Sequence, residues 1–366
     1  MTVTRDGWPR PDDFAAPPDA ARLEAWSDAD RVARPARLGR LRARFADASV
    51  DAYFGVRPEH MRYLTGFTLG DGEEKVAGNS GQFLVAADEV VLLADSRYTI
   101  QAQREAPESR LVEAYGDLPE RWPELVASIG ARRIAVEAGF VSHATWQRLA
   151  EAAPDVELVP IEGWVEADRA TKEPAELERV AAACAVADRA LAALLPEIGP
   201  DRTEAELALR LEWLMRTGGA EALAFEVACL AGPEAALPHG APGDRRLQSG
   251  SVVLFDFGAQ VAGYRSDMTR TLFVGEPSVR DLAVYELVAE AQAAAITYLE
   301  TAVAGGGDLP SGRAVDAVAR QVIDDAGHGE HFGHGTGHGI GLATHEAPSL
   351  GKRAPETALP SPTAFS

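Results

Sequence analysis

The sequence predicts two domains, an α/β domain followed by a domain of long helices, paired strands and a ribbon rich in glycine and histidine. The length of 366 residues suits two domains. In the first half of the chain, strand-like and helix-like segments alternate over about 130 residues, the pattern of an α/β fold. The ribbon, residues 331–348 with the sequence HFGHGTGHGIGLATHEAP, holds four of the eight histidines of the chain.

The composition restricts the class of protein. A hydrophobic content of 46% and a charged content of 25% are typical of a soluble globular protein. The net charge of −21 disfavours nucleic acid and anionic membranes as partners. No apolar run reaches the roughly 18 residues of a membrane helix, and the first residues lack the pattern of a secretory signal. With only Cys184 and Cys229, no disulfide framework is expected, which favours a cytoplasmic protein.

The first elements follow from local patterns. Residues 1–33 are rich in Pro, Asp and Ala without clear periodicity, and we expect them to form an N-terminal arm, either mobile or wrapped over the surface. A helix follows, then the strand VDAYFGV and the short helix HMRYLTGF, which should end near Gly66. The segment GQFLVAADEVVLLAD predicts a hairpin. The next helix, in SRYTIQAQREA, is expected to be capped by Ser96.

The α/β pattern continues to about residue 165. The segments RLVEAY, RRIAVEA and VELVPI predict strands, with the helices LPERWPELVASIG and SHATWQRLAEAA between them. We expect Glu137, at the end of one strand, to be a surface charge. No segment resembles a phosphate loop or a nucleotide fingerprint. These patterns predict a first domain over residues 34–165 and a second over residues 166–366.

The second domain begins with two helices. The segment TKEPAELERVAAACAVADRALAALLPEIG predicts a long helix with Pro174 in its first turn, where proline is tolerated. The helix in RTEAELALRLEWLMRTGG should be capped by Thr203, with Glu206 completing a capping box. The strand VACLAG follows. Two further helices, expected over residues 278–303 and 311–326, lead into the histidine ribbon.

Two aspartates lie on neighbouring strand-like segments. The segment SVVLFDFGAQVAGYRSDMTRTLFVG predicts two strands joined by a turn at Ala262-Gly263. If these strands pair, Asp256 and Asp267 can face one pocket. Two carboxylates with an imidazole form an oxygen–nitrogen ligand set suited to Mn²⁺, Co²⁺, Fe²⁺ or Zn²⁺. The alternative is that both aspartates merely pair with Arg265 and Arg270.

Within the ribbon, His338 is the best candidate for a metal ligand. His334 would share its face only in a helix, and the glycine content argues against a helix. The pattern therefore differs from the helical HExxH zinc motif. His345 is a candidate for polarising a carbonyl or stabilising a tetrahedral intermediate. His239, in a loop before the Asp256 strand, and His328 are single loop histidines, for which a surface position is the usual outcome.

The segments around the two aspartates and the histidine ribbon, spaced as they are, resemble the prolidase and Xaa-Pro aminopeptidase branch of the methionine aminopeptidase/creatinase superfamily, which has the pita-bread fold. The match covers residues 35–366, because the N-terminal α/β domain resembles the creatinase-type domain of that family. The resemblance implies the fold class α/β plus α+β, with a creatinase-type domain followed by a pita-bread domain. It also implies hydrolysis of the peptide bond preceding proline in peptide substrates, and a homodimer.

The resemblance also implies a site with two divalent metal ions, manganese or cobalt, or zinc. Asp256 and Asp267 match its two aspartate ligands, and His338 matches its histidine ligand. His345 and His239 match the two histidines that contact substrate and stabilise the intermediate, and His334 matches a position near the substrate pocket.

One part of the family pattern has no match in this sequence. The resemblance implies two further glutamate ligands downstream, the first in a T-x-E-P-G segment and also the general base. The sequence reads LGKRAPETALPSPTAFS after the ribbon, where Glu356 stands too early to match. We therefore expect a pita-bread domain truncated before its last strands, with weak or no metal binding and impaired hydrolysis.

Two other functions are compatible with the sequence. A creatinase-like hydrolase would cleave a non-peptide C–N bond without metal, but Asp256, Asp267 and His338 would then have no obvious use. A non-catalytic binding homologue would suit the unmatched glutamates, although such a protein has no reason to keep the whole histidine ribbon.

Overall fold

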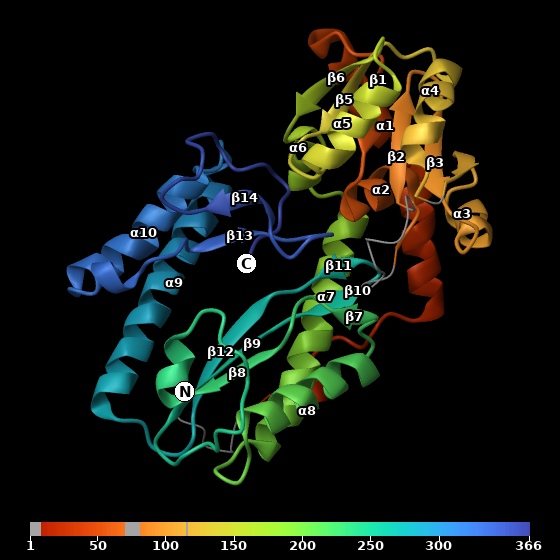
Figure 1. The fold of residues 1–366 in the computed structure, drawn as a ribbon. Coiled ribbons are helices and arrows are strands. Elements are labelled where there is room, and N and C mark those ends of the chain that lie inside the picture. The colour runs from red at the N-terminus through yellow and green to blue at the C-terminus, as the bar shows by residue number, and fades with distance from the viewer. Residues whose placement is uncertain (1–8, 70–80, 115) are drawn as a thin grey trace. The chain divides into compact units, whose positions relative to one another are not determined.

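A computed structural model of the protein describes residues 9–69, 81–114 and 116–366. The chain forms two compact units (Figure 1). The first unit consists of Glu24–Asp168, and the second combines the residues up to Leu23 with Arg169–Ser366. The units therefore divide the chain at residues 168/169, close to the expected boundary at 165.

A mixed six-stranded sheet forms the centre of the unit Glu24–Asp168, in the order β4-β3-β2-β1-β5-β6. The strands β1, β2 and β3 pair antiparallel, whereas β4, β5 and β6 join parallel to their neighbours. The strands are β1 (Ala52–Gly55), β2 (Gln82–Ala86), β3 (Val90–Ala94), β4 (Arg110–Glu113), β5 (Arg133–Glu137) and β6 (Glu157–Ile161). The helices are α1 (Ala20–Ala48), α2 (Pro58–Thr65), α3 (Thr99–Glu105), α4 (Leu118–Ser128), α5 (His143–Ala152) and α6 (Trp164–Ala170).

This unit has a hydrophobic core of its own. Phe54 of β1 meets Trp122 of α4 edge to face, with ring centroids 5.2 Å apart, and both side chains are fully buried. Aliphatic residues of β2, β3 and β5 complete the core. The predicted α/β alternation is confirmed, as is the β2–β3 hairpin. Gly66 ends α2 in the left-handed conformation, with φ 87°, as expected.

Three predictions for this unit are wrong. Residues 20–33 are helical, because α1 begins at Ala20 after Asp19, whose carboxylate accepts the backbone N–H of Arg22 and caps the helix. Ser96 is not the cap of α3, which begins at Thr99 with Tyr98 as its N-cap. Glu137 is not a surface charge: its side chain is only 4% exposed.

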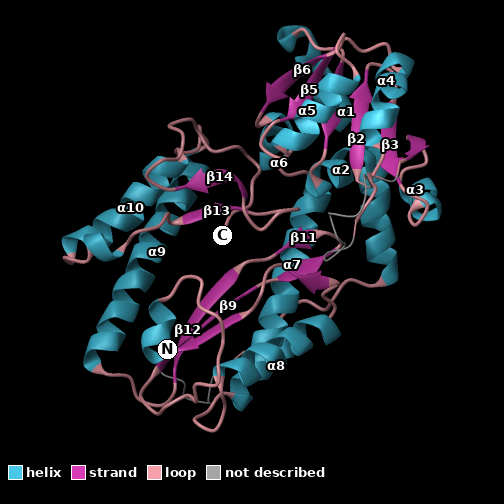
Figure 2. Ribbon diagram, in the orientation of Figure 1, coloured by secondary structure: helices cyan, strands magenta, loops and turns pink. Residues whose placement is uncertain are grey.

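The second unit combines four long helices with short antiparallel sheets (Figure 2). The helices are α7 (Pro174–Leu194), α8 (Glu204–Thr217), α9 (Val279–Gly305) and α10 (Gly312–Asp325), with short 3-10 helices at η1 (Pro11–Asp13), η2 (Leu195–Glu197), η3 (Gly232–Ala236) and η4 (Gly329–His331). The strands are β7 (Ala222–Leu223), β8 (Ala228–Ala231), β9 (Val252–Phe257), β10 (Ala259–Val261), β11 (Tyr264–Arg265), β12 (Met268–Phe273), β13 (Gly337–Gly339) and β14 (Glu346–Leu350).

Three of these strands, in the order β12-β9-β8, form the sheet that carries the aspartates. The strands β10 and β11 form a hairpin whose turn is Ala262-Gly263, with φ values of 47° and 83°. The predicted turn is therefore confirmed. Pro174 occupies the first turn of α7, and Thr203 caps α8 in a capping box with Glu206, as predicted. Among the described residues, no helix combines the length and apolar character needed to cross a membrane.

Candidate active site

Asp256 lies on the open face of β9. Along this strand the side chains alternate between a buried and a half-buried face, and Phe255 and Phe257 are fully buried on the core side. Asp256 therefore points to the opposite face rather than into the core. Its cross-strand partner Thr269 donates a hydrogen bond to its carboxylate at 3.1 Å. Burial, followed by the charge of Asp267, raises the pKa of Asp256 above its ordinary value.

Asp267 lies between β11 and β12, on the return from the Ala262-Gly263 turn. Because β12 pairs antiparallel with β9, Asp267 reaches the same end of the sheet as Asp256. The predicted pairing of the two strands is confirmed, and Asp267 lies close enough to act electrostatically on Asp256; that both carboxylates face one pocket stays a prediction. Among the contacts of the two arginines named in the alternative, Arg265 donates to Gln260 and Thr344, and Arg270 donates to the carbonyl of Thr269.

His338, in the centre of β13, contacts one of the two aspartates. Its Nε2 lies 3.2 Å from Oδ2 of Asp267, and its Nδ1 lies 3.2 Å from the carbonyl oxygen of Gly339. Two acceptors at the two ring nitrogens favour the protonated imidazole. The hydrogen bond to Asp267 therefore raises the pKa of His338, and partial burial opposes this effect.

His345 is stacked against His338. The ring centroids are 4.1 Å apart and the planes are inclined by 34°. Burial of the ring, and then the neighbouring charge of His338, lower the pKa of His345. His345 nevertheless has much of its surface exposed, so a ligand can reach it.

His239 lies in the exposed loop between η3 and β9. It is close enough to act electrostatically on Asp256 and on His345. The loop is tied down by Glu204 at the start of α8, whose buried carboxylate accepts the backbone N–H groups of Ala231 and Gly243, at 2.7 and 3.1 Å. His239 is therefore near the site, not an unrelated surface histidine.

The structure does not bring His334 into this group. His334 is exposed, and its ring packs edge-on against Phe332 with centroids 5.0 Å apart. Its Nδ1 lies 2.7 Å from the carbonyl oxygen of Gly335. A role for His334 at the substrate pocket stays a prediction.

A buried ion pair on α10 holds the first part of the ribbon. Arg320 and Asp316, one helical turn apart, form two hydrogen bonds of 2.9 Å. Asp316 also accepts the backbone N–H and the hydroxyl of Thr336, while Arg320 donates to the carbonyl oxygens of Phe332 and His334. This pair was not among the predicted features, although an aspartate four residues before an arginine on a helix is a visible signal in the sequence.

A second ion cluster holds the end of the ribbon. Glu346, the residue after His345, contacts Arg169 and Lys172, and all three side chains are at most 4% exposed. Glu346 was visible as the only acid in the ribbon, but nothing in the sequence pointed to its partners, which lie more than 170 residues earlier.

The donor set fits a divalent metal ion in its chemistry. Two ligands bound to one ion at about 2.1 Å lie about 3.0–3.4 Å apart, and the Asp267–His338 separation of 3.2 Å falls in that range. A cation would also relieve the repulsion between the two carboxylates that raises the pKa of Asp256. In the part of the chain that the structure describes, these donors form no converged group of three or more.

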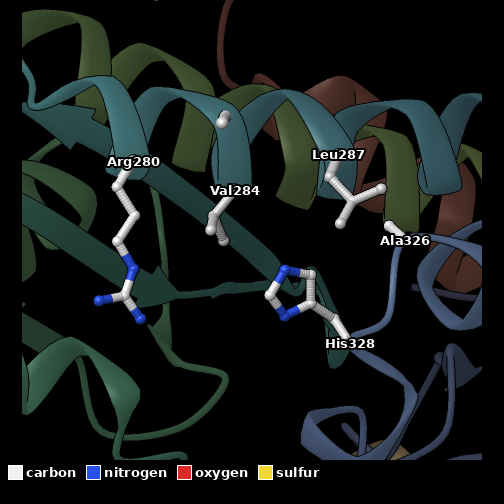
Figure 3. Close-up of a pocket in the computed structure, with 6 residues that line it drawn as sticks. Arg280, Val284, Leu287, Ala326 and His328 are labelled. Carbon is white, nitrogen blue, oxygen red and sulfur yellow. The ribbon is translucent and has the colours of Figure 1, made fainter.

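A separate hollow of about 300 Å³ lies between α9 and the residues after α10 (Figure 3). It is lined mainly by apolar side chains, and His328 points into it from one side. The residues that line it are Arg280, Ala283, Val284, Leu287, Ala326 and His328. None of the predicted site residues is among them, so this hollow is distinct from the His338–Asp267 site.

The chain is similar to known peptidases over nearly its full length. It is 31% identical over 315 residues to the Xaa-Pro dipeptidase of Pyrococcus furiosus, which covers 86% of this chain and 84% of that protein. The solved structure of an Xaa-Pro dipeptidase from Bacillus anthracis superposes with a TM-score of 0.81 at 33% identity, covering 91% of this chain and 88% of the other. An X-Pro aminopeptidase structure from Thermotoga maritima gives a TM-score of 0.79 at 31% identity, covering 90% and 88%.

Family descriptions match both parts of the chain. Residues 37–171 match the Creatinase/Prolidase N-terminal domain, and residues 178–364 match metallopeptidase family M24. The resemblance to the pita-bread peptidases is thereby confirmed, and a metallopeptidase family implies divalent metal ions. The chain therefore belongs to metallopeptidase family M24 and is a hydrolase of the peptidase class.

Proposed function

We propose that this protein hydrolyses the peptide bond preceding a proline, with divalent manganese or cobalt held by Asp256, Asp267 and His338. The contact between Asp267 and His338 carries the proposal, because it joins a carboxylate and an imidazole from distant parts of the chain at ligand–ligand spacing. The likeness to Xaa-Pro dipeptidases supports the choice of substrate.

The histidines around this pair supply the remaining groups. A bound divalent ion would supply Lewis acidity and lower the pKa of water. His345, stacked on His338, can hold a hydrogen toward the oxygen of the scissile carbonyl as negative charge develops there. His239, which approaches from the loop before β9, can serve the proline nitrogen as it leaves. His334 lies four residues before His338 in the ribbon and would contact the rest of the peptide.

Hydrolysis of Ala-Pro, compared with hydrolysis of creatine, tests the proposal. We expect proline release from Ala-Pro after loading with Mn²⁺ or Co²⁺, loss of that activity with EDTA, and no turnover of creatine. Creatine hydrolysis that survives EDTA would instead establish a metal-independent C–N hydrolase. Binding of Ala-Pro without turnover would identify a non-catalytic homologue.

Chain length of the substrate distinguishes a dipeptidase from an aminopeptidase. Ala-Pro and Ala-Pro-Ala share the scissile bond and differ only in the alanine that follows proline, for which the enzyme must have space. A dipeptidase cleaves the first and spares the second, whereas an aminopeptidase cleaves both.

A further inference from the structure

Three charged side chains are buried together behind the end of the ribbon. Nζ of Lys172 lies 2.9 Å from Oε1 of Glu346, and Nη2 of Arg169 contacts Oε2 of the same carboxylate. Lys172 also donates to the carbonyl oxygen of Arg169 at 2.7 Å. The exposed fractions of the side chains are 2% for Arg169, 1% for Lys172 and 4% for Glu346. One carboxylate therefore compensates two buried cations.

The same carboxylate shapes the turn that carries His345. Oε2 of Glu346 accepts the backbone N–H of Ala343 at 3.2 Å, which closes the turn onto the side chain. Gly341 lies so close that a Cβ added there would meet Oε1 of Glu346 at 2.4 Å. The backbone that leads into His345, at Gly341 and Ala343, is thus packed directly against a carboxylate that two cations hold in place.

His345 has little else to fix its orientation. Its ring is exposed enough for a ligand to approach, and its ring contact within the described residues is the stacking on His338. A catalytic imidazole must be held close to its productive geometry. Burial does not immobilise the ring of His345. Its orientation therefore depends on the backbone of the turn, which Glu346 holds in place.

We infer that Glu346, held by Arg169 and Lys172, is a positioning residue that sets the orientation of His345 toward the scissile carbonyl. This inference rests on the proposed function, because it assigns His345 a catalytic task. Glu346 itself touches no reacting atom: it acts through the backbone of the turn. Lys172 and Arg169 act one step further away, by fixing the carboxylate.

Kinetics of Glu346→Gln give the first test. Glutamine keeps the size and one acceptor but loses the charge that holds both cations. For metal-loaded enzyme acting on Ala-Pro, we expect kcat to fall at least tenfold, with KM and the affinity for Mn²⁺ changed less than twofold. Glu176→Gln is the matched control, because Glu176 on α7 is also a glutamate with a buried side chain, and it accepts a hydrogen bond from the hydroxyl of Tyr264.

A double-mutant cycle shows whether the effect passes through His345. In the His345→Ala background, Glu346→Gln should cause no further loss of kcat, because the positioned group is already gone. Equal losses in the two backgrounds, or an unchanged kcat in Glu346→Gln, would overturn the inference.

A spectroscopic readout separates this inference from the proposed function. In protein with isotope-labelled histidines, the ring signals of His345 should shift or broaden in Glu346→Gln, while those of His60 and His143 in the other unit stay in place. This measurement needs no peptidase activity. Failure to cleave Ala-Pro would disprove only the proposed function. Unchanged ring signals of His345 would disprove only the positioning role of Glu346.

Two further variants guard against a folding failure. Lys172→Met removes one cation and leaves the balanced Arg169–Glu346 pair, and the double variant Lys172→Met/Glu346→Gln keeps the net charge of the wild-type cluster. Both should displace the His345 signals, the double variant more strongly. If the signals are displaced equally in the Glu176→Gln control, the effect is general loosening, and the inference is wrong.

Discussion

Three buried carboxylates, Glu137, Asp316 and Glu346, have similar surroundings in different parts of the molecule. Each accepts hydrogen bonds from backbone N–H groups and from at least one side chain, and each is at most 4% exposed. A buried carboxylate is costly without such partners. These residues therefore fix backbone segments that have no regular secondary structure to hold them.

In the unit Glu24–Asp168, the buried carboxylate of Glu137 is stabilised by its hydrogen-bond partners. Burial by itself would raise the pKa of Glu137, but His60, the hydroxyl of Tyr53 and the N–H of Val56 together outweigh it, so the pKa is lowered. An unfolded glutamate has a pKa of about 4.3. Glu137 therefore stabilises the fold above that pH, and its contribution disappears as the pH falls through the lower folded pKa.

Replacing Glu137 should consequently change both stability and its dependence on pH. We expect Glu137→Gln to lower the free energy of unfolding by about 3 kcal/mol at pH 7, because charge-assisted hydrogen bonds are lost in a buried site. The difference from the wild type should shrink below about pH 4. Urea unfolding followed by circular dichroism at pH 7 and pH 3 measures it.

Glu157→Gln is the control for that experiment. Its carboxylate is 57% exposed beside Arg133, and exposed pairs contribute about 0–1 kcal/mol. A Glu137→Gln deficit of the same size at both pH values would contradict the pKa argument.

At the scale of elements, the helices α8 and α10 place loops that carry site residues. The N-terminus of α8 holds the loop after His239 through Glu204, and α10 holds the start of the ribbon through Asp316 and Arg320. Neither helix supplies a candidate metal ligand. Unfolding of either helix would nevertheless remove the hydrogen bonds that hold a loop with site residues in place.

The buried Asp316–Arg320 ion pair on α10 gives a prediction about stability. Asp316→Ala leaves Arg320 buried without its carboxylate and should cost about 3–5 kcal/mol. Arg313→Ala, on the same helix, breaks an exposed pair with Glu356 and should cost less than about 1 kcal/mol. Chemical unfolding measures the loss of free energy of unfolding in both variants. Equal losses would show that the Asp316–Arg320 pair contributes no more than an exposed surface pair.

The cap of α8 gives a smaller effect. Thr203→Ala removes the acceptor for the N–H of Glu206 and should lower the free energy of unfolding by about 1 kcal/mol. Thr203→Ser retains the hydroxyl and should be near neutral. If the serine variant is as unstable as the alanine variant, the loss comes from the methyl group and not from the cap.

The sequence predicts features that depend on neighbouring residues better than features that depend on distant ones. The capping box at Thr203, Pro174 in the first turn of α7 and the turn at Ala262-Gly263 are local patterns, and the structure confirms them. The antiparallel pairing of β9 with β12, the strands beside Asp256 and Asp267, was likewise predicted from a local strand–turn–strand pattern.

Contacts between distant residues could not be predicted in this way. Glu346 meets Arg169 across 177 positions, and Glu137 meets His60 across 77. The helical pattern of α1 was missed before residue 34, where Ala and charged residues carry helix propensity without an apolar stripe. The contact of His338 with Asp267 was expected through the family resemblance, since spacing alone does not determine it.

At the scale of the whole molecule, the chain is divided into two compact units. Among the described residues, the core cluster around the six-stranded sheet is made of side chains from Glu24–Asp168. A unit with its own core is expected to fold by itself. We predict that the fragment 24–168 unfolds cooperatively in urea, and that Trp122→Ala weakens it by about 3–5 kcal/mol. A fragment without a cooperative transition would show that its core depends on the other unit.

The central claim is that Asp267 and His338, with Asp256, hold a divalent metal ion. Titration of the protein with Mn²⁺, followed by calorimetry, tests this claim most directly. Since three donors are fewer than a full ligand set, we expect modest affinity. It should fall at least tenfold in Asp267→Asn and His338→Ala but stay unchanged in His328→Ala, whose imidazole lines the separate hollow on α9. Equal Mn²⁺ affinity in all four proteins would contradict the claim.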